Sequence, residues 1–113
     1  MKYLLDTNHW SYLQRNDPAV LTYIQNLPDE VTIYMSVVSQ AELLFGVELA
    51  TSESQKQKLR VLYEQIIAET TDIIHINSRV AEQYASILVA LRRKGRPIET
   101  NDIWIAATAR AYN

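Results

Sequence analysis

Three short apolar runs, each followed by a longer stretch of helical periodicity, constrain the fold of this chain more than any other feature of its sequence. The runs cover residues 2–6, 31–35 and 72–76 and are rich in the β-branched, aromatic and aliphatic side chains that strands favour. Because two parallel strands need a crossover connection, usually a helix, this alternation predicts an α/β fold. We expect a central parallel sheet with helices on its faces.

Start and stop signals place two helices between the first two strands and two between the second and third. Residues 8–15 are expected to form the first helix, for which Thr7 or Asn8 can be the cap. The second begins at Asp17-Pro18 and ends before Pro28. The third covers residues 36–50, and four of its apolar side chains are expected on one side: Val38, Ala41, Leu44 and Phe45.

The remaining helices have clearer signals. Ser52 and Gln55 form a capping-box pattern before an amphipathic helix. Its apolar residues recur at steps of three and four: Leu59, Leu62, Tyr63, Ile66 and Ile67. Asn77 can cap a long helix that ends near Gly95, and Asn101-Asp102 opens the last helix.

Composition limits the class of protein. A chain of 113 residues with 48% hydrophobic content is typical of one domain, here residues 1–113. It contains no cysteine, which excludes disulfides, thiolate catalysis and cysteine-based zinc sites, and fits a cytoplasmic protein. No apolar run approaches the roughly 20 residues of a membrane span, and the N-terminus lacks a signal-peptide pattern. The formal net charge of -2 favours neither binding nor avoidance of nucleic acid.

Three acidic residues occupy places where an open parallel sheet builds its sites. Asp6 ends the first strand, Glu42 lies near the start of the helix after the second strand, and Asp102 begins the last helix. Strand ends and the helix starts that follow them meet at one edge of such a sheet. Clustered carboxylates without cysteine or histidine partners suit Mg²⁺ or Mn²⁺. The pattern therefore predicts a divalent-metal site.

Each acid also has a purely structural interpretation. Glu42 follows Ser39 by three residues and could complete a capping box, Asp102 could be a first-turn acid that interacts with the helix dipole, and Asp6 could itself be an N-cap. His9 and His75 lack any ligand spacing and are expected to be structural.

Four cations lie close together near the end of the fifth expected helix: Arg92, Arg93, Lys94 and Arg96. They could be a solvated helix end or could contact RNA phosphates. Two other enzyme classes are excluded by missing residues. A haloacid dehalogenase needs an aspartate where this chain has Asn8. A nucleotide-binding Rossmann or P-loop protein needs a glycine-rich turn, and the only glycines of this chain are Gly46 and Gly95.

The segments LLDTNHWSYL, SVVSQAELLFGVE and GRPIETNDIWIAATA, in this order, resemble the PIN domain family and specifically its VapC-type toxins. The resemblance implies a three-layer α/β/α fold around a parallel sheet. It also implies that Asp6, Glu42 and Asp102 are metal-binding catalytic acids, and that three neighbours support them by hydrogen bonding: Thr7, Asn8 and Ser36.

The same resemblance implies an activity and partners. The family cuts single-stranded RNA, often tRNA, with Mg²⁺ or Mn²⁺, and is inhibited by a small antitoxin of the VapB type. Members usually continue past the last helix into a strand and a segment with a fourth site residue, whereas this sequence ends at Asn113. We therefore expect a C-terminally shortened PIN fold. The alternative is a catalytically weak or inactive PIN module that binds antitoxin or self-associates.

The helical pair within residues 37–69 carries more apolar side chains than a small sheet can cover from one side. Exposed apolar surface of this kind is typical of an interface. We expect antitoxin, a second copy of the chain in a homodimer or higher oligomer, or both, to cover it.

Overall fold

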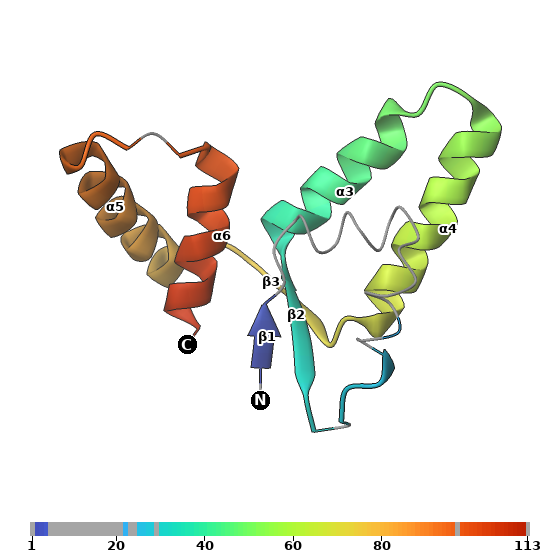
Figure 1. Cartoon of the computed structure of the whole chain (residues 1–113), viewed down its shortest axis with the longest axis horizontal. Coiled ribbons are helices and arrows are strands. Elements are labelled where there is room, and N and C mark those ends of the chain that lie inside the picture. The colour runs from blue at the N-terminus through green and yellow to red at the C-terminus, as the bar shows by residue number, and fades with distance from the viewer. Residues whose placement is uncertain (1, 5–21, 23–24, 29, 97, 113) are drawn as a thin grey trace.

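The computed structural model describes residues 2–4, 22, 25–28, 30–96 and 98–112. Strands and helices alternate along these residues, and Figure 1 shows the strands lying between two pairs of helices. The elements, in chain order, are β1 (Lys2–Leu4), β2 (Thr32–Ser36), α3 (Val37–Leu49), α4 (Glu53–Glu69), β3 (Asp72–Ile74), α5 (Ser78–Arg93) and α6 (Thr100–Ala111).

The strands form a parallel sheet in the order β1-β2-β3. Leu4 pairs with Tyr34, and Ser36 pairs with Ile74, so the carboxyl ends of the strands lie at one edge. Thr71 extends the pairing just before β3 begins. Its backbone N–H donates to the Ile33 carbonyl at 2.8 Å, and its hydroxyl accepts from the Ile33 N–H at 3.2 Å. The parallel α/β sheet predicted from the sequence is confirmed.

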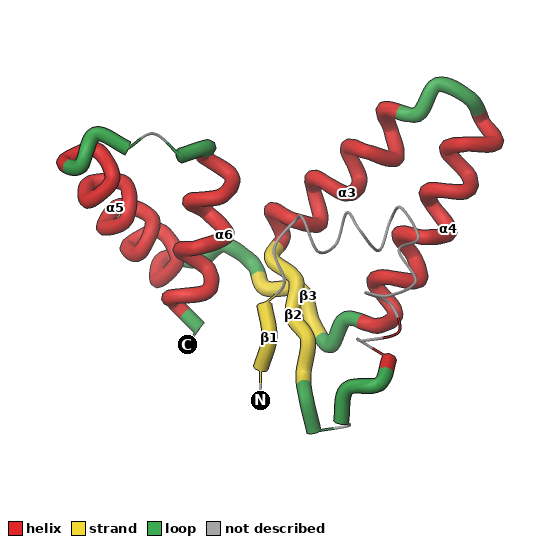
Figure 2. The backbone as a smooth tube through the Cα atoms, viewed as in Figure 1, coloured by secondary structure: helices red, strands yellow, loops and turns green. Residues whose placement is uncertain are grey.

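Helices α3 and α4 lie on one side of the sheet and α5 and α6 on the other, as Figure 2 shows, which is the expected three-layer arrangement. The larger buried cluster joins β2 to α3 and α4: Ile33, Met35, Leu43, Val47, Tyr63 and Ile66. A smaller cluster joins α5 to α6 through Val80, Ala107 and Ala111. The described core therefore has two parts, one for each helix pair.

Side-chain caps begin three of the helices. The Ser52 hydroxyl accepts from the Gln55 N–H at 3.1 Å, and the Asn77 side chain accepts from the Val80 N–H at 3.0 Å, so both predicted caps are confirmed. Ser36 caps α3 and accepts from the Ser39 N–H at 3.0 Å. The capping-box interpretation of Ser39 with Glu42 is therefore wrong, because the helix begins three residues earlier.

The apolar side expected for α3 is not its buried side. The fully buried residues of this helix are Ser39, Leu43 and Val47, whereas the Phe45 side chain is 65% exposed. The helix carries apolar residues on nearly every side, so its periodicity alone could not select the face that β2 and α4 cover.

Helix α5 ends in a Schellman motif. The Gly95 N–H donates to the Arg92 carbonyl, and the Arg96 N–H donates to the Leu91 carbonyl, both at 3.1 Å. Gly95 has a φ of 65°, a left-handed conformation in which a side chain is strained. The predicted end of this helix at Lys94-Gly95 is confirmed.

Some predicted bounds differ or lie outside the described residues. The last helix begins at Thr100 after Glu99, not at Asn101, and β3 ends at Ile74. Thr22 and Gln25 are helical, as the second expected helix requires. Residues 5–21, including the expected first helix, lie outside the described part of the chain. In the segments that the structure describes, no helix is both long and apolar enough to cross a lipid bilayer.

Candidate functional site

Glu42 lies in the second turn of α3 and is half-buried. The helix follows β2 without a connecting loop, since Ser36 is both the last residue of the strand and the N-cap. Ser36 is 1% exposed, and its hydroxyl also donates to the Ser39 hydroxyl at 3.2 Å. Ser36 therefore sets where α3 leaves the carboxyl edge of the sheet, and with it the position of Glu42.

Asp102 lies in the first turn of α6 and is exposed. Its neighbours Ile103 and Ile105 are buried and anchor the helix, so the acid projects from a fixed element. Helix α6 packs against both α5 and α3. The helices that carry Glu42 and Asp102 are therefore in direct contact, although the two acids are sixty residues apart in the sequence.

The third predicted acid, Asp6, lies outside the described residues, as do Thr7, Asn8 and His9. Among the described residues, no group of three or more acidic or histidine side chains is placed to hold a metal ion. Glu42 and Asp102, on packed helices, have the oxygen donors that hard divalent cations prefer. The donor chemistry therefore fits a divalent ion, and the clustering of all three acids stays a prediction. His75 is exposed after β3.

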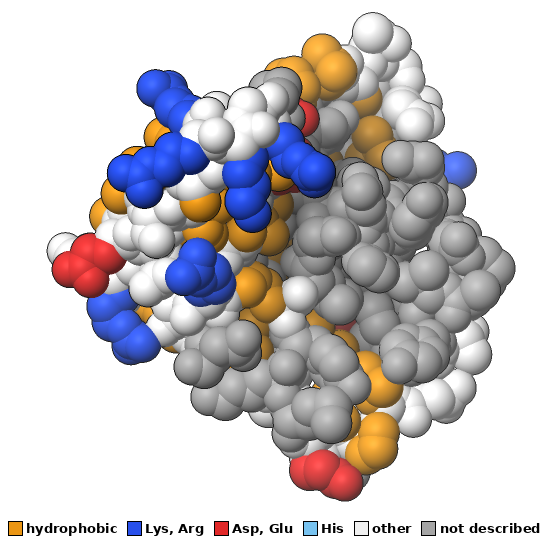
Figure 3. Space-filling view, turned by 60° about the vertical axis from the view of Figure 1, so that its left-hand side comes forward, with side chains coloured by type: hydrophobic (Ala, Val, Ile, Leu, Met, Phe, Trp, Pro, Cys, Tyr) orange, Lys and Arg blue, Asp and Glu red, His pale blue; other side chains and the backbone are white. Residues whose placement is uncertain are grey.

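The four predicted RNA-contacting cations lie at the end of α5 and in the following turn, and all are exposed: Arg92, Arg93, Lys94 and Arg96. Figure 3 shows Lys and Arg side chains gathered on this part of the surface. No acidic residue occurs between Glu82 and Glu99. The segment therefore presents a local positive charge in a chain whose net charge is negative.

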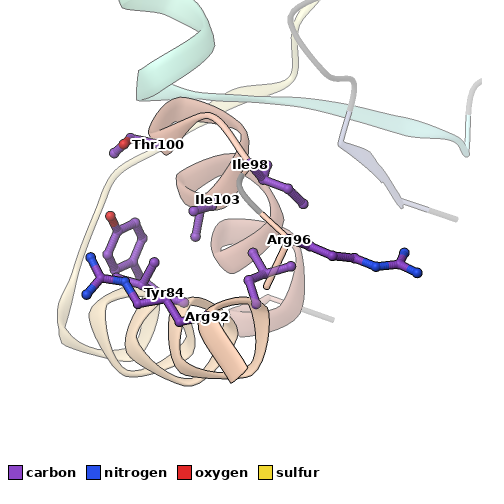
Figure 4. Close-up of a pocket in the computed structure, with 8 residues that line it drawn as sticks. Tyr84, Arg92, Arg96, Ile98, Thr100 and Ile103 are labelled. Atoms are coloured by element: carbon purple, nitrogen blue, oxygen red, sulfur yellow. The ribbon is translucent and has the colours of Figure 1, made fainter. Parts of the chain in front are cut away.

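A pocket of about 350 Å³, not predicted from the sequence, opens between α5 and α6. Arg92, Arg96 and Tyr84 contribute to its walls (Figure 4). The Tyr84 ring stacks on Trp104, with 3.8 Å between ring centroids and 20° between ring planes. The only sequence signal for this pocket was the cluster of cations beside an amphipathic helix. Its walls come together only when α5 and α6 pack.

Comparison with known proteins agrees with the resemblance seen in the sequence. The family model described as PIN domain matches residues 3–113. The chain is 32% identical to "Ribonuclease VapC1" of Haemophilus influenzae, and the match covers 100% of this chain and 82% of that protein.

Solved structures give the same result for the fold. The crystal structure of VapBC2 from Rickettsia felis, bound to a DNA fragment from its promoter, matches with a TM-score of 0.88 and 28% identity over 100% of this chain and 83% of that one. A member of the VapBC family of toxin-antitoxin systems from Mycobacterium tuberculosis matches with a TM-score of 0.72 and 27% identity, over 98% and 79% of the two chains.

Proposed function

Since the chain belongs to the PIN domain family, we propose that it is a divalent-metal-dependent endoribonuclease that acts as the toxin of a toxin-antitoxin pair. The observation that carries this proposal is the likeness to a VapC ribonuclease along the whole chain. The packing of α3 against α6, which carry Glu42 and Asp102, supports it. The family match to residues 3–113 is consistent with one PIN domain.

The catalytic acids in this proposal are Asp6, Glu42 and Asp102, and they would hold Mg²⁺ or Mn²⁺. A divalent ion bound there supplies Lewis acidity, which makes hydroxide available near neutral pH and offsets charge on the phosphate. Thr7 and Asn8 would orient Asp6 by hydrogen bonding. Ser36 supports Glu42 indirectly, because its hydroxyl fixes the first turn of α3.

The proposed substrate is single-stranded RNA or tRNA, hydrolysed at a phosphodiester bond. The RNA backbone would be attracted by four cations: Arg92, Arg93, Lys94 and Arg96. They would hold the RNA near Asp102, because the chain after α5 leads directly into α6. Contacts of this kind position the strand without reading its sequence. They also make binding weaken as salt concentration rises.

The proposed protein partner is a VapB-type antitoxin. Phe45 and Leu49 are one helical turn apart on α3, and each is 65% exposed, so they form an apolar stripe on the surface of the α3–α4 pair. Val61 on α4 is also exposed. Apolar patches of this kind mark interfaces. Antitoxin binding, self-association of two copies, or both would cover this stripe.

A nuclease assay tests the proposed activity directly. A fluorescently labelled single-stranded RNA is incubated with the purified chain and Mn²⁺ or Mg²⁺, with and without EDTA. We expect cleavage that EDTA abolishes. Asp102→Asn should reduce the rate by more than about 100-fold, because even residues that only orient metal ligands are worth 10- to 100-fold.

The matched control is Glu64→Gln, which removes an exposed acid of α4. This variant should cleave RNA at the wild-type rate. Wild-type cleavage by Asp102→Asn would refute the assignment of this acid. No cleavage by the wild-type chain with either metal would favour the inactive binding module instead.

A further inference from the structure

We propose that the pocket between α5 and α6 is a nucleotide subsite that seats one base of the RNA beside the cleavage site. This inference rests on the proposed ribonuclease function, because it names the part of the substrate that the chain holds next to Asp102. The volume of about 350 Å³ lies within the range of pockets that bind small organic groups, roughly 300–1,000 Å³.

The walls of the pocket combine apolar surface with polar groups, as a nucleotide needs. The described lining includes the aliphatic side chains of Leu88, Leu91, Ile98 and Ile103. Ile98 is 48% exposed, so part of this apolar lining faces solvent. Tyr84 adds an aromatic side chain, and its stacking on Trp104 holds the ring in place. Bases of single-stranded RNA bind to surfaces of this kind because every base has an apolar face.

Two cations at the same pocket, Arg92 and Arg96, can pair with the phosphates on either side of a base. Figure 4 shows Arg92 beside Tyr84, whereas Arg96 extends away on the opposite side. The Schellman motif brings both arginines to the pocket, since it reverses the chain between them through the left-handed Gly95. The Thr100 side chain supplies a hydroxyl to the lining.

The place of the pocket in the fold favours RNA over an acidic peptide. Thr100 and Ile103 line the pocket, and Asp102 belongs to the same first turn of α6, although it is not among the described lining residues. A strand with one base in the pocket would therefore run along the turn that carries a proposed catalytic acid. An acidic peptide would match the arginines but would leave the apolar walls without a counterpart.

A substitution that adds a positive charge can distinguish binding of a base in the pocket from electrostatic attraction of the RNA to the surface. Ile98→Lys puts a cation into the pocket, and Val89→Lys puts the same cation on the exposed surface of α5, at a position that is not among the described lining residues. The two variants have the same net charge. Affinity for a labelled single-stranded RNA is measured by fluorescence anisotropy in EDTA, so that no metal-dependent cleavage is needed.

We expect Ile98→Lys to weaken RNA binding by about tenfold or more, the effect of losing one stacked base. Val89→Lys should bind RNA as tightly as wild type or more tightly. Equal affinities for the two variants would overturn the proposal. Because the assay needs no cleavage, the subsite and the nuclease activity can fail independently.

A second measurement uses the unaltered chain, so that it does not depend on how a variant folds. The isoleucine methyl groups are observed by NMR during titration with a nucleoside 5′-monophosphate, with inorganic phosphate and with a hexaglutamate peptide. We expect the Ile98 and Ile103 signals to shift with the nucleotide more than with phosphate. Equal shifts with phosphate, or larger shifts with the peptide, would overturn the base-binding role.

Discussion

Replacing Ser36 by alanine should destabilise the chain more than the same change at Ser52, although both serines cap a helix with one hydrogen bond. Loss of an N-cap costs about 1 kcal/mol, within a range of 0.5–2. Ser36 is buried and also donates to Ser39, whereas the hydrogen bond of Ser52 to Gln55 is exposed and water can replace it. Leaving a buried backbone N–H without an acceptor adds to the cost.

The expected losses are about 2 kcal/mol for Ser36→Ala and about 0.5–1 kcal/mol for Ser52→Ala. For a chain of this length, 1 kcal/mol corresponds to roughly 4 °C of Tm, so the expected decreases are about 8 °C and about 2–4 °C. Thermal and urea unfolding followed by circular dichroism measure both. Ser36→Ala should also slow RNA cleavage at a temperature where it is fully folded, because Glu42 lies on the helix that it caps.

The Ser52 variant is the control for cleavage, since α4 carries none of the proposed catalytic acids. Equal decreases in Tm would show that burial does not strengthen the α3 cap. A Ser36→Ala protein that is less stable but cleaves RNA at the wild-type rate would show that the cap does not position Glu42.

Three further substitutions test other features. Gly95→Ala should cost about 1–2 kcal/mol in urea unfolding, because alanine is strained at a φ of 65°, although an added Cβ would meet no atom within 4 Å. Leu43→Ala should cost about 2–5 kcal/mol in the same assay, since this side chain is 1% exposed in the larger cluster. Phe45→Gln should change stability by less than about 0.5 kcal/mol and yet weaken self-association or antitoxin binding, measured by analytical ultracentrifugation and by pull-down with a co-expressed antitoxin. Unchanged association would show that the exposed stripe of α3 is not the interface.

The sequence allowed the sheet to be predicted because strand propensity, helix periodicity and capping residues all agreed. Ser52 and Asn77 are caps whose hydrogen bonds are local, so their neighbours in the sequence determine them. The end of α5 could also be predicted from Gly95, because a glycine in the left-handed conformation commonly follows the last turn of a helix.

Features that depend on contacts between distant segments could not be predicted in this way. The buried face of α3 is set by its contacts with β2 and α4. It could not be predicted from the sequence, because α3 also carries apolar residues on its other sides, such as Phe45. The pocket between α5 and α6 likewise exists only after Tyr84 and Ile98 are brought together. Of the predicted site, Glu42 and Asp102 are described on packed helices, and Asp6 stays a prediction.

The division of the described core into two clusters has a consequence for how the fold opens. Among the described residues, the buried cluster shared by α5 and α6 is the smaller of the two, and three residues, 75–77, connect α5 to the sheet. Amide protons in this pair should exchange with deuterium sooner than those of β2 and α3, since local opening follows the amount of apolar surface buried. Asp102 would move with the pair during such an opening, and Glu42 would stay with the larger cluster. A ligand that binds both carboxylates would therefore connect the two clusters, and slower exchange along α5 would report its binding from a distance.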